Sequence, residues 1–151
     1  MSSTIGVSRP IPSIDALLGG RKVLPAKQRG AMDWIAVVRQ GLSAAAIDAM
    51  AKTIRVTQSE LAAALCIPER TLARRKKEGR LSSEESAKLV RLARVVGRAL
   101  ETFEDLDAAL DWLKSPNAAL SGATPLSLLD TEIGAESVTD TLGRIAHGVF
   151  A

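Results

Sequence analysis

Apolar residues recur every three or four positions along most of the chain, which is the spacing of helices that bury one face. The pattern predicts a first helix over residues 31–40, ended by Gly41, and a second helix capped by Ser43. The residues expected to be buried are Met32, Trp34, Ile35, Val37 and Val38 in the first helix and Ile47, Met50, Ala51 and Ile54 in the second. Both methionines and Trp34 are interpreted as packing residues and not as parts of a cofactor site.

Residues 57–77 predict two short helices joined by a tight turn. Thr57 and Glu60 form a capping box that begins the first helix, and Pro68 is expected at the first position of the second. The inner faces are expected to hold Leu61, Ala62, Leu65, Leu72 and Ala73, and the outer face of the second helix carries Arg70, Arg74 and Lys77. A short basic helix at a steep angle to its predecessor suits the major groove of DNA. A solvated basic face on a helical hairpin would give the same spacing, so both interpretations stay open at this point.

A long helix is predicted next, from a second capping box at Ser82 and Glu85 to about Phe103, after Gly79 ends the basic helix. Its expected inward stripe is Leu89, Leu92, Val96, Ala99, Leu100 and Phe103. Its basic residues, expected largely away from that stripe, are Lys88, Arg91, Arg94 and Arg98. They could contact the backbone of a bound nucleic acid or only keep the surface soluble, and the sequence favours neither.

Three more short helices are predicted beyond residue 104, over residues 105–114, from Thr124-Pro125 onward, and over residues 136–147. Their expected inward residues are Leu106, Ala109, Leu110 and Leu113, then Leu126, Leu128 and Leu129, then Val138, Leu142 and Ile145. His147 would lie near the C-terminal end of the last helix, where a cation is favoured.

The first 30 residues are rich in Ser, Pro and Gly and carry Arg9, Arg21, Lys22, Lys27 and Arg29. A short apolar turn over residues 14–18 could dock on the rest of the chain. The segment is interpreted as a basic N-terminal arm, either one that touches phosphates or, as the favoured interpretation, a poorly ordered leader.

Composition narrows the class of protein. Alanine and leucine are abundant and tyrosine is absent, which favours an all-α fold over sheets. One cysteine and one histidine among 151 residues argue against a disulfide framework, a metal site or a catalytic triad, so no catalytic residue, metal or cofactor is expected. No apolar run approaches the roughly 20 residues of a membrane span, and the N-terminus lacks the apolar stretch of a secretory signal, so a cytoplasmic location is expected.

The charge is divided unevenly along the chain. Residues 1–100 hold 18 Lys and Arg against 8 Asp and Glu, whereas residues 101–151 hold 2 against 9. The division predicts two surfaces with different partners, a polyanion for the first part and a basic protein for the second.

The helical pair resembles the helix-turn-helix of the Cro/repressor-like (Xre) family. Gln58, Ala62 and the turn Cys66-Ile67-Pro68 match the family pattern, and Cys66 departs from it because this corner usually holds a left-handed glycine. The resemblance implies contact with DNA by Thr57, Gln58, Glu69, Arg70, Thr71, Arg74, Arg75 and Lys77. Gln58 is expected near phosphates and residues of the second helix near base edges, with a homodimer on paired half-sites about 34 Å apart.

Residues 112–151 resemble the toxin-binding domain of Xre-type antitoxins of the ParS group. The matching features are Trp112-Leu113, Pro116-Asn117, the stretch from Gly122 to Asp130, and the closing run from Gly143 to Val149. The resemblance implies an antitoxin with no catalytic role, paired with a RES-domain toxin that depletes NAD⁺, in a complex that can be of higher order than the dimer. The implied toxin-binding residues are Trp112, Arg144, His147, Gly148, Val149, Phe150 and Ala151, with residues 144–151 expected to occlude the toxin's active site.

The sequence therefore predicts a basic arm (residues 1–30), a Cro/repressor-like helix-turn-helix domain (31–103) and a small helical toxin-binding module (104–151). Such an antitoxin would also bind the promoter of its own operon. The main alternative is a stand-alone Cro/repressor-like regulator whose C-terminal module only dimerises, and a further one is a helical adaptor that does not bind DNA.

Overall fold

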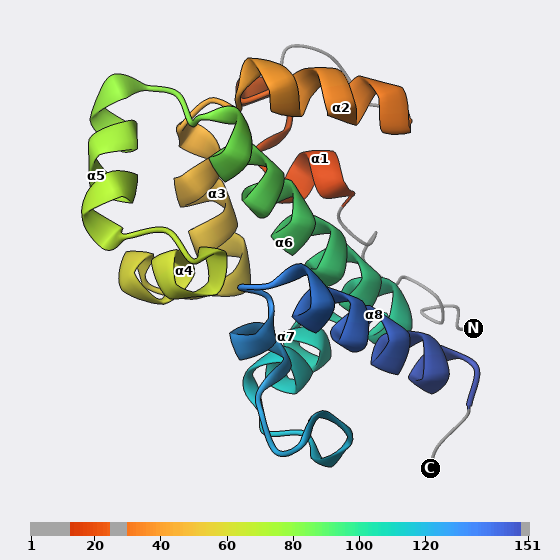
Figure 1. Cartoon of the computed structure of the whole chain (residues 1–151). Coiled ribbons are helices and arrows are strands. Elements are labelled where there is room, and N and C mark those ends of the chain that lie inside the picture. The colour runs from red at the N-terminus through yellow and green to blue at the C-terminus, as the bar shows by residue number, and fades with distance from the viewer. Residues whose placement is uncertain (1–12, 25–29, 149–151) are drawn as a thin grey trace, which may run out of the picture.

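The computed structural model describes residues 13–24 and 30–148, and all its regular elements there are helices (Figure 1). In chain order they are α1 (Ile14–Leu17), η1 (Gly20–Lys22), α2 (Ala31–Gln40), α3 (Ala45–Ile54), α4 (Gln58–Leu65), α5 (Glu69–Glu78), α6 (Ser83–Phe103), α7 (Leu106–Lys114), η2 (Ala118–Leu120), η3 (Pro125–Leu128) and α8 (Glu132–Ala146). The described ranges contain no strand and one isolated bridge, between Ser43 and Arg80. The predicted all-α fold is confirmed.

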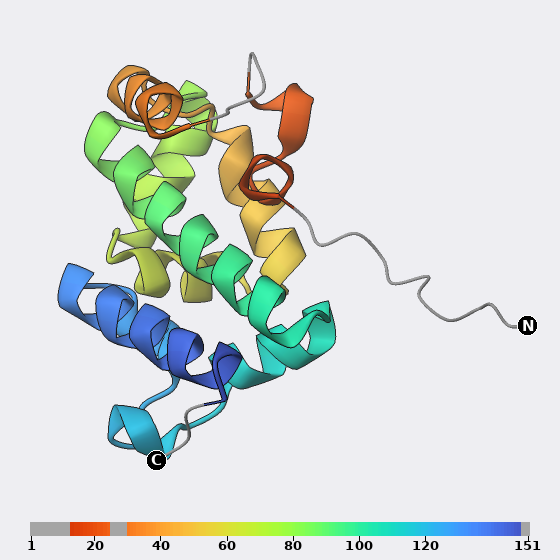
Figure 2. The same ribbon diagram turned by 90° about the vertical axis from the view of Figure 1, so that its right-hand side faces the viewer.

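The long helix α6 is the scaffold on which the other elements pack. Figures 1 and 2 show it running diagonally through the molecule, with α2 to α5 toward its first half and α7 and α8 toward its second, while α1 contacts it at Gly97. The predicted inward stripe is confirmed from Leu89 to Leu100, where all five of its residues are buried, while Phe103 at its end is half-buried. Ala93 is also fully buried, because α6 is covered on more than one side. The helix therefore belongs to both halves of the chain.

The two halves share one hydrophobic core. Its buried residues form a single cluster that runs from Leu17 in α1 to Leu142 in α8. Polar contacts cross the predicted boundary after residue 103 as well, because the Arg55 guanidinium lies 2.6 Å from Asp107 and the Lys114 ammonium donates to the Arg55 carbonyl. The C-terminal module is thus packed against the helix-turn-helix and is not linked to it by a free connector.

The interpretation of the N-terminal segment as a poorly ordered leader is wrong for residues 13–24. Ser13 caps α1, and Leu17 and Leu18 are completely buried, as is nearly all of Leu24. The apolar turn docks on α6 at Gly97, where Ile14 and Leu17 lie 3.7 and 3.9 Å from the position that a Cβ at residue 97 would take. Residues 1–12 and 25–29 lie outside the described ranges.

Helix α2 has the predicted bounds but not the predicted burial. None of its residues is fully buried: Met32 is 75% exposed and Ile35 40% exposed, while Trp34, Val37 and Val38 are half-buried. The helix lies at the surface along the first half of α6, so only one edge of it meets the core (Figure 2). Met32 is therefore not a packing residue, whereas Met50 in α3 is fully buried as expected.

The capping boxes Thr57–Glu60 and Ser82–Glu85 are both present, and α6 ends at Phe103 as predicted. Three predicted starts are one residue off, since Pro68 precedes α5 as its N-cap, Ala44, not Ser43, is the N-cap of α3, and Asp105 precedes α7 as its N-cap. In each case the helix begins one residue later than predicted.

Helix α8 begins four residues earlier than predicted, at Glu132. Thr131 caps it by accepting a hydrogen bond from the Gly134 amide at 3.0 Å. A side chain at position 134 would place its Cβ 1.9 Å from the Leu128 carbonyl oxygen, so only glycine allows η3 to approach this turn. The sequence alone does not show that Ile133 and Gly134 belong to the helix, because the close approach of the Leu128 carbonyl that requires glycine can be seen only in the structure.

Candidate functional site

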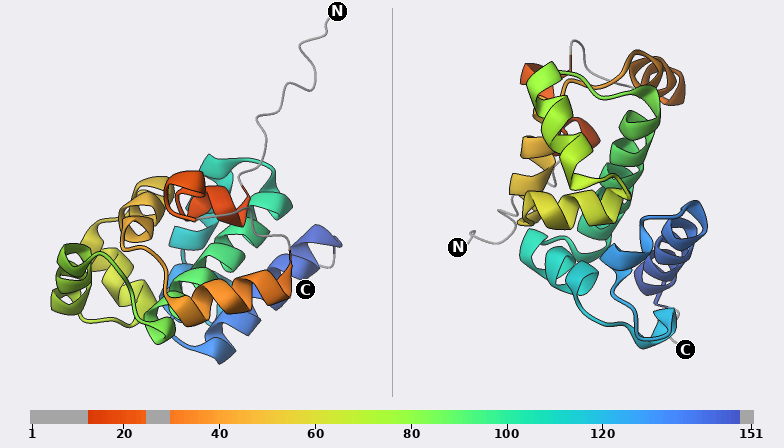
Figure 3. Two further views of the ribbon diagram at one scale, coloured as in Figure 1. Left: turned by 90° about the horizontal axis from the view of Figure 1, so that it is seen from above. Right: turned by 60° about the vertical axis from the view of Figure 1, so that its left-hand side comes forward.

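The turn between α4 and α5 has the geometry that the sequence resemblance predicts. Cys66 is left-handed, with φ 53° and ψ 47°, although it is not a glycine. Ile67 anchors the turn in the core, and the Lys88 ammonium donates to the Cys66 carbonyl at 3.1 Å. The departure at Cys66 therefore changes the residue and not the shape of the corner. Figure 3 shows α5 standing free at one side of the molecule.

Helix α5 contacts the core mainly through Leu72, its only fully buried residue. Ala73, expected on the inner face, is exposed, because α5 packs on the core mainly through one side chain and most of its surface faces solvent. Of the predicted DNA-binding residues in α5, Glu69, Arg70, Arg74 and Lys77 are exposed, and Thr71 and Arg75 are half-buried. The exposed surface of α5 is therefore strongly basic.

Arg75 is tied to the start of α6. Its Nε donates to Glu85 Oε1 at 2.8 Å, and its Nη1 donates to Glu78 Oε1 at 3.0 Å. The same Glu85 oxygen accepts from the Ser82 amide at 2.8 Å, so one carboxylate caps α6 and holds α5. The hydrogen bonds that Arg75 donates, first to Glu85 and then to Glu78, raise the pKa of its guanidinium.

Burial of Glu85 alone would raise the pKa of its carboxyl. Hydrogen bonds from the Ser82 amide, the Arg75 guanidinium and the Ser82 hydroxyl outweigh that effect, so the net pKa of Glu85 lies below its usual value. The pKa of the exposed Glu60 carboxyl is likewise lowered, first by the hydrogen bond from the Thr57 amide.

Lys76 is a further positioning residue that the sequence reasoning missed. Its Nζ lies 2.9 Å from Asp48 Oδ1 in α3 and donates to Gln58 Oε1 in α4 at the same distance. Three helices thus meet at one ammonium, which brings Gln58 next to α5. The partners are 28 and 18 residues away in the chain, so helical spacing gave no signal for them.

The predicted toxin-binding residues that can be described lie on two elements. Trp112 is half-buried, with its ring centroid 5.7 Å from that of Phe103, which fits a packing role. Arg144 near the end of α8 is exposed and donates to the Thr141 hydroxyl at 3.2 Å. His147 and Gly148 are exposed at the end of that helix. Val149, Phe150 and Ala151 lie outside the described residues.

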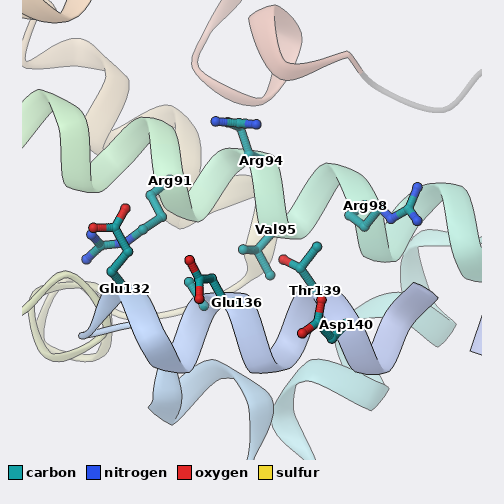
Figure 4. A pocket seen from close by; sticks show the side chains of 9 residues that line it. Arg91, Arg94, Val95, Arg98, Glu132, Glu136, Thr139 and Asp140 are labelled. Atoms are coloured by element: carbon teal, nitrogen blue, oxygen red, sulfur yellow. The ribbon is translucent and has the colours of Figure 1, made fainter. Parts of the chain in front are cut away.

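Arg91 and Arg98 of the basic stripe lie on the side of α6 next to α8, whereas Arg94 is exposed and points away from α8 (Figure 4). Lys88 donates to the Cys66 carbonyl instead. Arg91, Arg94 and Arg98 line one wall of a cavity of about 590 Å³, and Glu132, Glu136 and Asp140 line the other (Figure 4). Neither interpretation of the stripe drawn from the sequence included this contact. The acidic residues that face it come some 40 positions later in the chain, which places the pairing beyond local patterns.

Two kinds of feature are absent from the described part of the chain. It contains no cluster of three or more His, Cys, Asp or Glu residues that could hold a metal ion. It also contains no helix of the length and apolarity needed to cross a membrane.

Two family models match adjoining parts of the chain. The antitoxin Xre-like helix-turn-helix domain matches residues 33–94, and the antitoxin Xre/MbcA/ParS C-terminal toxin-binding domain matches residues 98–148. The chain is 37% identical to an "Antitoxin Xre" of Yersinia enterocolitica over 116 residues, covering 76% of this chain and 78% of that protein. The chain belongs to the Xre/MbcA/ParS antitoxin family.

Two other relatives place this Xre-type antitoxin in the same group. An "Antitoxin Xre" of Photorhabdus laumondii is 33% identical, with 77% of this chain and 80% of that protein covered. A "Prs ADP-ribosylating antitoxin" of a Sphingobium species is 30% identical, with 80% and 82% covered. The predicted antitoxin with a helix-turn-helix and a toxin-binding domain is thereby confirmed. The two matched regions meet inside α6, which agrees with the shared core of the Xre-type antitoxin.

Proposed function

We propose that this Xre-type antitoxin neutralises a toxin that consumes NAD⁺ by holding it with residues 104–151. The observation that carries the proposal is the match of residues 98–148 to a toxin-binding domain, within a chain whose other end presents an exposed basic helix. The family resemblance favours a RES-domain toxin that depletes NAD⁺. The Sphingobium relative is named for ADP-ribosylation, a reaction that also consumes NAD⁺.

The proposed neutralisation works by occlusion. Helix α8 ends with Arg144, His147 and Gly148 exposed, so the last turn is free to enter a partner's cleft together with Val149, Phe150 and Ala151. The Arg144 guanidinium, exposed in the last turn of α8, would pair with an acidic side chain at the edge of that cleft, because a planar cation can make two parallel hydrogen bonds with a carboxylate.

Co-expression with the toxin encoded by the neighbouring gene tests this proposal. The full-length chain should restore growth and cellular NAD⁺, while a chain lacking residues 148–151 should fold normally but fail to do so. Lys52→Ala serves as the control, because Lys52 is exposed on α3, outside residues 104–151, and the change keeps the length of the chain. Full protection by the truncated chain would show that occlusion does not depend on the tail, and failure to co-purify with the toxin would refute the antitoxin pairing itself. Modification of a target protein without bulk NAD⁺ loss would indicate an ADP-ribosylating toxin.

We further propose that a homodimer of this antitoxin binds its own promoter through α5. The proposal is supported by the exposed Arg70, Arg74 and Lys77, and by Gln58 next to the same helix through Lys76. One helix reads only a few base pairs, so two copies on half-sites about 34 Å apart are expected. A mobility shift on the upstream DNA of the operon at several salt concentrations tests this, because each phosphate contact lowers affinity as salt rises. A shift no stronger than that with unrelated DNA would contradict specific binding of the promoter through α5.

A further inference from the structure

The groove between α6 and α8 has walls of opposite charge whose carboxylates are not neutralised across it. Glu132, Glu136 and Asp140 are exposed and follow one another every four residues along α8. In the described part of the chain no ion pair within 4.0 Å joins these carboxylates to α6, and the nearest carboxylate of Arg98 is Glu101 on its own helix, at 3.8 Å. Figure 4 shows Arg91 and Arg98 on the side of α6 and Glu132, Glu136 and Asp140 on the side of α8, while Arg94 points away from α8.

Each wall is unfavourable by itself. Like charges three or four residues apart on a helix repel one another, and both the arginines of α6 and the carboxylates of α8 have this spacing. Arg91 also has a buried Nε without a hydrogen-bond partner, and its Nη2 reaches the Leu129 carbonyl only at 3.4 Å. Arg91 is thus incompletely paired on one wall, and the carboxylates of α8 on the other have no cationic partner among the residues that the structure describes.

We propose that this groove receives a segment of the toxin that presents basic side chains to α8 and an acidic side chain to α6. Charge complementarity carries the assignment: nucleic acid would be repelled by the more exposed acidic wall, whereas a peptide can match both signs. The cavity of about 590 Å³ has room for several side chains.

The inference rests on the proposed toxin binding and extends the toxin-binding surface toward the helix-turn-helix. The region matched to the toxin-binding domain begins at residue 98, and Arg91 and Arg94 lie before it, in the region matched to the helix-turn-helix. The toxin surface would thus include the helix whose first turn is tied to α5 by Glu85. The two activities of the chain would then share α6.

The competing explanation is that the walls attract each other and only stabilise the fold. Three variants of the full-length chain separate the two ideas: Asp140→Arg, Arg98→Glu, and the double variant with both changes. The double variant keeps the attraction across the groove and the net charge, but inverts the charges that a partner meets. Glu104→Arg, at the exposed turn after α6, is the control for a change of net charge elsewhere.

Association with the immobilised toxin of the neighbouring gene is measured at low and high salt, and the melting temperature of each variant is measured in parallel. We expect both single variants and the double variant to associate about tenfold more slowly at low salt, with a smaller difference at high salt, since charges at an interface act mainly on the association rate. Glu104→Arg should associate like the wild type. Melting temperatures should stay close to that of the wild type.

Recovery of both association and melting temperature in the double variant would overturn the proposal and leave an internal electrostatic contact. Unchanged association in all three variants would overturn it as well. If the wild-type chain itself fails to bind the toxin, the proposed function fails and the groove assignment fails with it, which differs from a wild type that binds and variants that bind equally well.

Discussion

Helices α5 and α8 are both strongly charged and lie toward opposite sides of the molecule (Figures 1 and 3), but the chain treats their charges in opposite ways. On α5, the side chains of Arg74, Arg75 and Lys76 each have a carboxylate partner within the chain. On α8, the carboxylates of Glu132, Glu136 and Asp140 have none within 4.0 Å in the part of the chain that is described. These basic side chains of α5 are thus paired among the described residues, whereas the acidic side chains of α8 are not.

The difference fits the partners that we propose for the two surfaces. A helix that enters the major groove must be held in one orientation, because contacts with base edges tolerate little displacement. Arg75 and Lys76 supply that restraint, while Arg70 and Lys77 stay exposed. A protein partner can supply the missing counter-charges itself, so the acidic wall of α8 gains its neutralisation on binding.

The largest expected effect is on the packing that supports α8. Gly134→Ala would place a Cβ 1.9 Å from the backbone oxygen of Leu128, and backbone cannot swing away as a side chain can. We expect a loss of about 3 kcal/mol or more in the free energy of unfolding. Gly97→Ala in α6 is the matched control, because its Cβ would meet Ile14 only at 3.7 Å and alanine is favoured in a helix interior. Denaturant unfolding measures both, and equal stability of the two variants would contradict the close approach of η3 to α8.

The restraint on α5 is tested by Glu85→Gln. Loss of the charge weakens the hydrogen bonds from Ser82 and Arg75, for an expected loss of about 2 kcal/mol, typical of hydrogen bonds to a charged group. The folded pKa of Glu85 is lowered, so its carboxylate stabilises the fold at neutral pH and this contribution is lost as pH falls through the folded pKa. The wild type should therefore lose stability from about pH 5 downward, and Glu85→Gln should lose less. Parallel pH profiles of the two proteins would contradict this role.

The basic face of α5 is tested by Arg74→Ala. The side chain is 60% exposed and only loosely paired with Glu78, at 3.9 Å, so it can turn toward DNA. A contact with a guanine edge would cost about 1–3 kcal/mol of binding free energy when removed, and mainly at one base position. A phosphate contact would instead weaken binding to all sequences and reduce the salt slope by about 1. Unchanged affinity and salt slope would remove Arg74 from the interface.

Local signals in the sequence predicted most of the helices, but the sequence did not reveal the contacts between residues far apart in the chain. Both capping boxes and the end of α6 depend on residues three positions apart or on a single residue, so they could be predicted. The Lys76 cluster, the cavity between α6 and α8, and the requirement for Gly134 depend on partners far along the chain or on a backbone approach. The prediction of burial was wrong in α2 for a similar reason. Periodicity gives the apolar face of a helix but does not show how much of that face another element covers.

The smallest expected effect is at the corner between α4 and α5, where a local departure from the family pattern can be reversed. Cys66 is held at φ 53°, a conformation that costs a residue with a side chain about 1 kcal/mol relative to glycine. Cys66→Gly removes that cost but gives the unfolded chain more freedom, which lowers the gain to a few tenths of a kcal/mol. We expect a slightly raised melting temperature and unchanged DNA affinity, because the shape of the corner is already the one that glycine adopts. Cys66→Ala, which retains the strain, should match the wild type in both. A marked change of DNA affinity in the glycine variant would mean that the turn is set by the Cys66 side chain and not by the backbone around it, and the rigid positioning attributed to α5 would then depend on that side chain.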